Sequence, residues 1–344
     1  MGCSISGLNA LYDVVQGGPD VWVNERKFKI LKQIGEGGFA FVYLVKEQQG
    51  VQPIKLPKDA KYIAEDGLYA LKKVLIQTDE QLDLVKQEIH ASSLFNHPNL
   101  LPLLEHSIIS AKGEGAWIRE AYLLFPVYED GTLLDILNGM RTKKEYFSTL
   151  SVLHIFKQIC EGLKEMHTLD PPYAHNDVKP GNVLLSKIKE QLPLAVLMDF
   201  GSAASARKQV QSRSEALALQ EWAAQHCSAP YRAPELWDCP SIADIDERTD
   251  IWSLGCTLYA IMYGVSPFEY SLGEADGSLQ LAAMSGQVKW APGPSPPYPD
   301  SLQKFVIWML EPRVALRPKI GDVLVHVDKL LSKLEVDGVN GKHL

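Results

Sequence analysis

The segment 173–185, YAHNDVKPGNVLL, places several reactive side chains within a few residues of one another. The carboxylate of Asp177 could orient a hydroxyl group and accept its proton, and Asn182 could help to hold a metal ion. Asn and Asp break regular structure and Gly181 follows soon after, so the segment is predicted to be a loop. A polar loop between core-forming segments is a common place for catalytic groups. By itself, the segment is equally compatible with an ordinary turn.

A second set of candidates lies upstream, in a glycine-rich stretch. Gly35, Gly37 and Gly38 lie in QIGEGGFAFV, between two predicted strands. Because glycine has no Cβ, backbone N–H groups there can approach an anion such as a nucleotide phosphate. Hairpins also use glycine for their own turns, so the signal is weak alone. The stretch leads into a strand rather than a helix, which argues against a dinucleotide-binding Rossmann turn.

Two charged residues and a further carboxylate complete the set. Lys72 lies in an otherwise apolar strand, and Glu88 falls on the following predicted helix, where it could pair with that lysine. Asp199 follows the apolar run LAVLM, and Mg²⁺ is typically held by one or two carboxylates plus substrate phosphates. Each residue is ordinary alone. Together they supply what phosphoryl transfer needs: glycine N–H groups and a lysine for the phosphates, Asn182 and Asp199 for Mg²⁺, and Asp177 for the incoming hydroxyl.

The composition limits the classes of protein to which the chain can belong. The chain has 344 residues, of which 46% are apolar and 22% charged, as in ordinary globular proteins large enough for two lobes. A net charge of −8 gives no support for nucleic-acid binding or for a wholly basic membrane-binding surface. Five cysteines without a CxxC pair argue against a disulfide framework or a zinc site and favour a reducing compartment. No secretory signal is recognised. Ile251–Phe268 has no charge, but its Ser, Thr, Gly and Pro favour a buried core helix over a membrane span.

The first third of the chain is predicted to be rich in strands. Residues 28–47 are predicted to form two strands around the glycine turn, followed by a polar loop insertion at 48–66 and a strand at 68–76. Thr78 and Gln81 have capping-box spacing at the start of a helix. The apolar face of that helix is expected to comprise Leu82, Leu84, Val85, Ile89 and Leu94.

The remainder of the chain is predicted to be rich in helices. Ser212 and Glu215 have capping-box spacing before a stretch of good helix formers, so a packed helix is predicted near 214–226, with Ala216, Leu219, Trp222 and Ala223 on one face. The other predicted helices are Thr149–His167, Ile251–Tyr263, Ser301–Leu310 and Ile320–Leu334. The Pro-rich stretch 291–300 is expected to be a loop. Strands followed by helices predict two lobes, with a boundary near Pro126–Gly131.

The order of these features resembles that of eukaryotic protein kinases across roughly residues 26–335. The motifs, in order, are IGEGGFAFV, YALKK, Glu88 nine residues before HPN, HNDVKPGN, DFG, YRAPE and DIWSLG. The resemblance implies an α+β, bilobal protein kinase fold with a small strand-rich N-lobe at 26–126 and a larger helical C-lobe at 127–335. A leader at 1–25 and a tail at 336–344 would flank it. ATP and Mg²⁺ are the implied cofactors, and proteins the implied substrates.

The resemblance also assigns roles to the residues that carry chemistry. Lys72 would bind phosphate with Glu88 as its partner, Asp177 would be the catalytic base, and Lys179 would stabilise the transition state. Asn182 and Asp199 would be the Mg²⁺ ligands. The residues implied to contact the nucleotide are Ile34, Gly35, Gly37, Val42, Ala70, Lys72, Phe125 and Val127.

The resemblance implies further roles around the adenine pocket and within the large lobe, and those of Glu235, Arg317 and Asp250 are structural. Phe125 would guard the rear of the adenine pocket, and Pro126–Tyr128 would form the hinge. Glu235 and Arg317 resemble the buried ion pair of the large lobe. Asp250 resembles the aspartate that braces the catalytic loop.

Two positions depart from the kinase pattern. Ala40 replaces the third glycine of the glycine-rich loop, which leaves Gly35 and Gly37 in place. Asn176 replaces the arginine that usually precedes the catalytic aspartate. In the family that arginine receives a phosphorylated activation loop, so this form of control is not expected here.

The branch and the location are suggested by two further stretches. Lys179, two residues after Asp177, resembles serine/threonine kinases, and SRSEALALQEWAAQHCSAPYRAPELW resembles the Numb-associated kinases. The start MGCSIS matches the myristoylation pattern, with Gly2 as the acceptor. One myristoyl chain binds membranes only marginally, and residues 1–25 lack a basic patch, so Cys3 is the expected second, palmitoylated site. We therefore expect a peripheral protein on the cytoplasmic face of membranes; the resemblance suggests Golgi or other endomembranes.

Two competing interpretations remain. One is a pseudokinase scaffold that binds partners without catalysis, although all five groups usually lost in such proteins are present. The other is a dual-specificity kinase that also acts on tyrosine. A phosphate-release assay distinguishes the first from an active enzyme, and phosphoamino-acid analysis tests the second.

Overall fold

The chain folds into two compact units of mixed α and β structure, so the predicted α+β class is confirmed. The computed structural model describes residues 4–5, 18–37, 40–49, 67–112, 117–128, 130–186, 193–272, 278–290 and 298–340. Unit 1 comprises residues 1–136 and 181–201, and unit 2 comprises residues 137–180 and 202–344. Most of the predicted loop insertion, Gly38 and most of the Pro-rich stretch lie outside the described residues.

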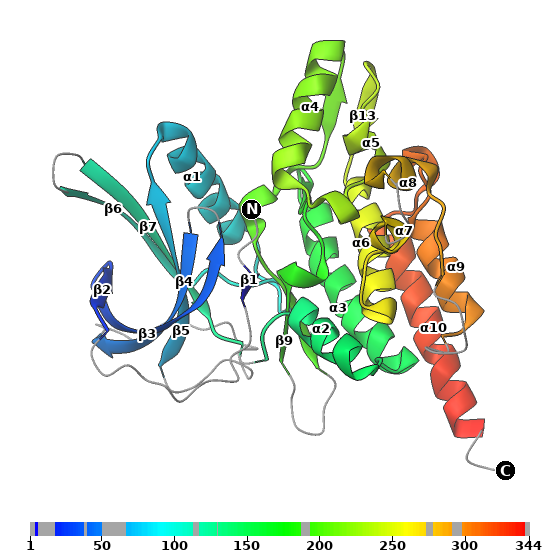
Figure 1. The fold of residues 1–344 in the computed structure, drawn as a ribbon, viewed down its shortest axis with the longest axis horizontal. Coiled ribbons are helices and arrows are strands. Elements are labelled where there is room, and N and C mark those ends of the chain that lie inside the picture. Colours follow the sequence, from blue (N-terminus) through cyan, green and yellow to red (C-terminus); the bar gives the residue numbers. More distant parts are fainter. Residues whose placement is uncertain are drawn as a thin grey trace. The chain divides into compact units, whose positions relative to one another are not determined.

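Unit 1 is built on an antiparallel sheet in which the strands follow the order β1-β3-β4-β5-β7-β6, with β2 also paired to β3 (Figure 1). Its strands are β1 (Ser4–Ile5), β2 (Asp20–Val23), β3 (Arg26–Gly37), β4 (Ala40–Gln49), β5 (Leu68–Ile76), β6 (Glu105–Lys112) and β7 (Trp117–Pro126). The predicted hairpin and the predicted strand at 68–76 are therefore confirmed. One buried cluster of the sheet joins Val21, Phe28, Val45, Leu71 and Leu124.

Strand β2 corrects the sequence-based boundary, which assigned residues 1–25 to a leader. Val21 and Val23 are buried, and β2 pairs with β3 in the register Val21 to Phe28. The strand has only four residues. Its alternation of exposed and buried side chains is therefore too short to be recognised from the sequence without knowledge of the strand that pairs with it.

Helix α1 (Asp79–Leu94) begins with the predicted capping box. The Thr78 Oγ1 accepts from the Gln81 N–H at 3.2 Å, and the Gln81 Oε1 accepts from the Gln77 N–H at 2.6 Å. The predicted apolar face is wrong in part, because Leu84 and Leu94 are exposed. The helix instead buries Val85, Glu88, Ala91 and Ser92. Tertiary packing thus turns a charged residue inward.

The second piece of unit 1 is a hairpin of β9 (Val183–Ser186) and β10 (Leu194–Leu197). Backbone hydrogen bonds fix it to the segment after α1: Leu197 N donates to Asn99 O, and Leu101 N donates to Leu197 O, both at 2.9 Å. This hairpin brings the segments that begin at Asn182 and end at Asp199 into unit 1.

Unit 2 is mainly helical (Figure 1). Its helices, the first shared with unit 1, are α2 (Leu133–Lys143), α3 (Thr149–His167), α4 (Arg213–His226), α5 (Pro234–Trp237), α6 (Arg248–Tyr263), α7 (Pro267–Leu272), α8 (Leu279–Ser285), α9 (Asp300–Met309) and α10 (Ile320–Asn340). Short strands pair as β8 (Tyr173–Ala174) with β11 (Ala204–Ser205), and β12 (Lys208–Val210) with β13 (Ala243–Ile245). Every helix predicted for this half is present, although α10 continues to Asn340, beyond the expected end at Leu334.

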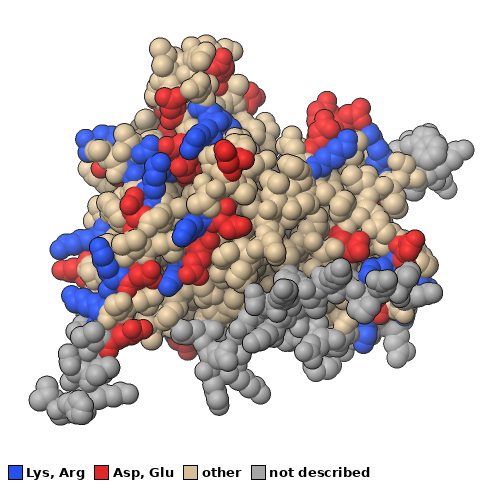
Figure 2. Space-filling view, turned by 180° about the vertical axis from the view of Figure 1, so that it is seen from behind, with Lys and Arg blue, Asp and Glu red and all other residues tan. Residues whose placement is uncertain are grey.

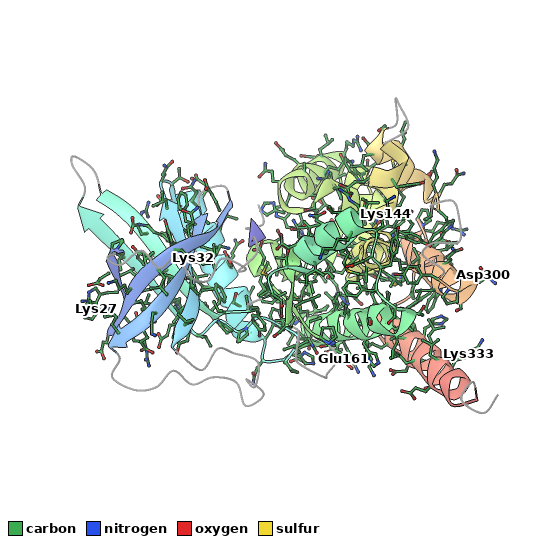
Figure 3. The ribbon with its side chains drawn as sticks, turned by 60° about the horizontal axis from the view of Figure 1, so that its bottom comes forward. Lys27, Lys32, Lys144, Glu161, Asp300 and Lys333 are labelled. Atoms are coloured by element: carbon green, nitrogen blue, oxygen red, sulfur yellow. The ribbon has the colours of Figure 1, made fainter. Side chains whose placement is uncertain are left out.

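The core of unit 2 forms around α3 and α6. Helix α6 is buried over almost its whole length, so the prediction of a core helix there is confirmed. Helix α10 packs along α3, and α9 packs on α6. Figure 3 shows Asp300 at the start of α9 and Lys333 on α10, both at the outside of this unit.

The surface carries both signs of charge. In the face drawn in Figure 2, basic and acidic residues are interspersed, and no large area of one sign is seen. None of the helices in the described ranges combines the length and the apolar character needed to cross a bilayer.

Candidate active site

Unit 1 contains an apolar pocket that gathers six of the predicted nucleotide contacts. Its lining includes Ile34, Val42, Ala70, Lys72, Phe125 and Val127. Most of its lining residues are apolar and its charged members are Lys72, Glu88 and Asp199, a combination usual for small-molecule sites. Gly35 and Gly37 do not line it, but they lie on β3 directly opposite Val42 and Ala40 of β4.

Sequence reasoning missed part of this pocket. Leu184 of β9 and Met198, which follows β10, also line it, although they lie more than 100 residues beyond the glycine-rich stretch. The apolar run Val183–Leu185 was the available signal, but it indicates only a buried segment. Which cavity the segment borders depends on how the β9–β10 hairpin is fixed to the rest of unit 1.

One end of the pocket is charged. The Lys72 Nζ lies 2.6 Å from the Glu88 Oε1 and 3.8 Å from the Asp199 Oδ1, and all three side chains are largely buried. Strand β5 supplies the lysine, α1 supplies the glutamate, and the turn after β10 supplies the aspartate. The predicted pairing of Lys72 with Glu88 is present.

The geometry around Asp199 leaves room for a further group. Its backbone has φ of 65°, in the left-handed region, where Asp is one of the better-tolerated residues. A Cβ on Gly201 would lie 3.3 Å from the Asp199 Oδ1, so the missing side chain keeps the carboxylate uncrowded. The Met198 N–H donates to the Asn182 carbonyl at 2.8 Å, which holds the segments carrying Asn182 and Asp199 side by side.

These two residues fit a magnesium site of the kind completed by a substrate. Among the described residues, no group of three or more His, Cys, Asp or Glu side chains could hold a metal by itself. Mg²⁺ does not require one, because it commonly takes one or two protein oxygens plus phosphate and water. The donor set of one carboxylate and one amide oxygen is of this kind.

The loop at 173–180 forms a second polar cluster, in unit 2. The Asp177 side chain is 5% exposed. Its Oδ2 accepts from the Lys179 Nζ at 2.7 Å, and its Oδ1 accepts from the Ser228 N–H at 2.9 Å. The Lys179 Nζ also donates to the Ser228 Oγ at 2.6 Å. The carboxylate is therefore held in one orientation by two elements that lie about fifty residues apart in sequence.

The backbone of this loop is held in place by hydrogen bonds to the Asp250 carboxylate. The Asp250 Oδ2 accepts from the His175 N–H at 2.7 Å, and its Oδ1 accepts from the Asn176 N–H at 2.8 Å. The His167 Nε2 lies 2.9 Å from the same carboxylate. The brace expected from Asp250 is thereby confirmed.

Asn176 itself adopts a left-handed backbone conformation with φ of 66°. Its side-chain amide donates to the Ala174 carbonyl at 3.2 Å and to the Ser202 carbonyl at 3.0 Å. The kinase pattern has an arginine at this position. The shorter Asn176 side chain instead donates hydrogen bonds to these two backbone carbonyls.

The segment that leads to Ser228 is a packed helix, as predicted. The Ser212 Oγ caps α4 by accepting from the Glu215 N–H at 3.2 Å, and Ala216, Leu219 and Ala223 are buried. Trp222 is half-buried; its ring stacks on His226 and carries the Lys208 ammonium 3.8 Å from its centroid. Burial raises the pKa of the neighbouring Cys227 thiol to about 12.

The predicted acylation sites, Gly2 and Cys3, lie outside the described residues. The other four cysteines, Cys160, Cys227, Cys239 and Cys256, are free and buried.

Comparison with known proteins identifies similar chains along nearly the whole length. The family model described as the protein kinase domain matches residues 28–327. A probable serine/threonine-protein kinase of Dictyostelium discoideum is 31% identical, over 90% of this chain and 95% of its own. Serine/threonine-protein kinase 16 of Rattus norvegicus is 35% identical and that of Homo sapiens 34%, each over 92% of both chains.

Proposed function

Because this chain belongs to the protein kinase family and is a protein serine/threonine kinase, we propose that it phosphorylates proteins at a membrane surface, to which two acyl groups attach it. The Numb-associated kinases are the branch to which we assign it. The residues 212–237 support that assignment, since their sequence resembles the corresponding segment of that branch.

The nucleotide part of the proposal is supported by the pocket in unit 1. Its apolar walls, which include Ile34, Val42 and Leu184, suit a flat heterocyclic base such as adenine. Lys72, kept in place by Glu88, suits the phosphates of ATP at the charged end. Asn182 and Asp199 would hold Mg²⁺, which when bound neutralises charge on the phosphate oxygens.

The chemistry at the acceptor hydroxyl is assigned to the loop in unit 2. Asp177 would orient a serine or threonine hydroxyl and accept its proton while the oxygen forms a bond to the γ-phosphorus of ATP. The bond between that phosphorus and the bridging oxygen breaks, and ADP leaves. Lys179, 2.7 Å from the Asp177 carboxylate, would stabilise negative charge on the transferred group.

The single observation that most favours an active enzyme over a scaffold is the Lys72–Glu88 contact of 2.6 Å, with Asp199 beside it. This contact places a cation for the phosphates and a carboxylate for a metal ion at one end of the apolar pocket, as phosphoryl transfer requires. No observation favours tyrosine as an acceptor.

Attachment to membranes is supported by the sequence MGCSIS and by the burial of every described cysteine. S-acylation needs an accessible thiol, and Cys3 lies beside the glycine that the myristoylation pattern identifies. A single myristoyl chain gives an association constant of only about 10⁴ M⁻¹, so stable attachment needs the second chain.

Metabolic labelling with myristate and palmitate analogues, followed by cell fractionation, tests the attachment. We expect Gly2→Ala to lose both labels, and Cys3→Ser to lose the palmitate label and to move largely to the soluble fraction. Asp199→Asn should fractionate like the wild type, because it affects only phosphoryl transfer. If Cys3→Ser remains as membrane-bound as the wild type, the requirement for two acyl chains is wrong.

A further inference from the structure

We propose that Lys208 determines substrate specificity: its ammonium binds an anionic side chain, a carboxylate or a phosphate, that lies within about five residues of the acceptor hydroxyl in the substrate. The proposal rests on the proposed function, since it concerns the protein substrates that Asp177 would orient. It goes beyond that function by naming a substrate class, acidic segments of proteins, and the residue that selects it.

Lys208 is a cation on the apolar face of a small sheet. It begins β12, where side chains alternate between the two faces, so it shares a face with the buried Val210. In the register of β12 with β13, Lys208 lies opposite Ile245. Val210 and Ile245 both belong to one buried cluster of unit 2. The half-buried Lys208 therefore lies at the margin of this cluster.

Aromatic rings hold the ammonium in place. The Lys208 Nζ lies 3.8 Å from the centroid of the Trp222 ring, a cation–π contact. The Trp222 ring stacks in turn on the His226 ring, with centroids 4.7 Å apart and an angle of 9° between the planes. The His226 Nδ1 lies 2.8 Å from the Trp222 carbonyl, and the His226 carbonyl accepts from the Ser202 Oγ at 2.8 Å. The stack is thus fixed to the backbone at its His226 end.

The Lys208 ammonium forms no ion pair with any Asp or Glu among the residues that the structure describes. The acidic residue of the two-stranded sheet, Asp244, lies opposite Gln209 and so belongs to the other, exposed face. Burial lowers the pKa of Lys208, and no carboxylate of the described residues raises it. The preceding Arg207 is exposed and also has no ion pair within the described ranges. The positive charge at this place is therefore not compensated by the described part of the chain.

The stack lies beside the loop that would receive the acceptor hydroxyl. Ser228, two residues after His226, donates its N–H to the Asp177 carboxylate at 2.9 Å. The pKa of the Cys227 thiol between them is raised to about 12, chiefly by burial and in part by Asp177, while the Lys208 ammonium opposes the rise. Two residues and two ring contacts shorter than 5 Å separate Ser228 from the ammonium. That path of roughly 15 Å corresponds to about five residues of an extended peptide.

An anionic side chain of the substrate would supply the missing partner. A carboxylate or phosphate forms charge-assisted hydrogen bonds with an ammonium, and these are stronger than hydrogen bonds between neutral groups. Because the Trp222 ring already orders the lysine side chain, binding would cost little additional side-chain entropy. A neutral substrate residue would gain nothing there, and a basic one would be repelled. If the stack served only to fasten α4 to β12, a neutral side chain of the same length would replace Lys208 without changing substrate preference.

The test measures kcat/KM of the purified full-length chain with Mg-ATP and peptides that contain a single serine. The peptides carry Glu, phosphoserine, Lys or Ala at each of about five positions on either side of that serine, in an otherwise neutral sequence. Lys208→Met keeps the length of the side chain and its packing on Trp222 but removes the charge. Lys208→Arg keeps the charge, and Lys208→Glu reverses it.

Arg213→Met is the matched control. Arg213 is a cation of the same segment, and its guanidinium donates to the Cys239 carbonyl at 3.4 Å. It lies at the other end of α4, about 20 Å along the helix from His226. Its replacement should therefore leave the peptide preference unchanged.

We expect wild-type kcat/KM to be about tenfold higher with Glu than with Ala at one of the positions, and lower with Lys there. In Lys208→Met this ratio should fall to within about twofold, in Lys208→Arg it should persist, and in Lys208→Glu the preference should pass to Lys. Comparing phosphoserine with Glu at that position identifies which of the two anions the lysine prefers. Carbodiimide coupling of the Glu peptide, followed by mass spectrometry, should modify Lys208, which gives a readout independent of turnover.

Two results would overturn the proposal: a wild-type enzyme that prefers an anion at none of the positions, or a preference that persists in a folded Lys208→Met protein. If Lys208→Met does not fold, the coupling experiment on the wild type decides the matter, and modification confined to other lysines is equally contrary. Failure of the kinase assignment would look different, because the wild type and Asp177→Asn would then show the same background rate with every peptide.

Discussion

The Glu88 carboxylate lies 2.6 Å from the Lys72 ammonium, on the inward face of a helix that leaves two of its leucines exposed to solvent. Helix α1 therefore gives up apolar burial in order to bring a carboxylate to the lysine of β5. The helix is thus oriented so that Glu88 reaches Lys72, and not so that the largest apolar area is buried.

Replacing Lys72 should abolish turnover, while replacing its neighbour should not. Lys72→Met removes the cation beside Glu88 and Asp199, so we expect the rate of phosphoryl transfer to fall by at least roughly 10²- to 10³-fold with the fold retained. Lys73→Met is the control, because Lys73 pairs with Glu120 at 2.8 Å and lies outside the pocket lining. Asp199→Asn should behave like Lys72→Met. Unchanged turnover in a folded Asp199→Asn protein would refute the assignment of the site.

The Glu235–Arg317 pair should matter for stability rather than catalysis. Both residues are buried, and the guanidinium donates to the two carboxylate oxygens at 2.7 and 2.9 Å. Arg317→Met leaves the Glu235 charge buried without its partner, so the free energy of unfolding should fall by about 3–5 kcal/mol in urea titrations. Arg313→Ala, which breaks an exposed pair with Glu311, should cost much less. If the free energy of unfolding falls equally in the two variants, the claim that burial makes the Glu235–Arg317 pair more important for stability is wrong.

Stability should decrease as the pH falls below neutrality. Burial lowers the pKa of His226, and it lowers those of His154 and His326 in the same way. The unfolded chain therefore binds protons more readily as the pH drops through the ordinary histidine value of about 6.5, so the free energy of unfolding falls from there down to the folded-state pKa values. Urea midpoints measured from pH 7.5 to 5 should show this decline. The decline should be smaller in His226→Phe; an identical slope would show that His226 does not contribute.

The described cysteines should react slowly with thiol reagents in the native protein. Burial raises the pKa values of Cys160, Cys239 and Cys256, as it does that of Cys227. Because the thiolate is the nucleophile, we expect unacylated wild-type protein to show one fast-reacting thiol, Cys3, and Cys3→Ser to show none. In denaturant, all five thiols of the wild type should react. A fast phase in native Cys3→Ser would contradict the burial of the other four.

The sequence by itself determined the features whose causes lie within a few residues. The strand at 68–76 and the helix at Thr149–His167 were predicted with the bounds the structure gives, since apolar periodicity is a local property. The caps at Thr78 and Ser212 were recognised for the same reason, because each side chain bonds an N–H only three residues away. The order of the motifs along the chain was sufficient to identify the kinase family.

Only the tertiary structure decided which faces and segments meet. The face of α1 turned inward because Lys72 lies on the neighbouring strand. The strand β2 joined the sheet because it pairs with β3 and because Val21 and Val23 enter the buried cluster of the sheet. Leu184 and Met198 entered the pocket through a hairpin fixed to Asn99 and Leu101. The partners of Asn176 lie up to 26 residues away and are backbone carbonyls, which carry no signature in the sequence. Such contacts depend on the packing of distant segments, and packing is a property of the folded chain rather than of any local stretch of it.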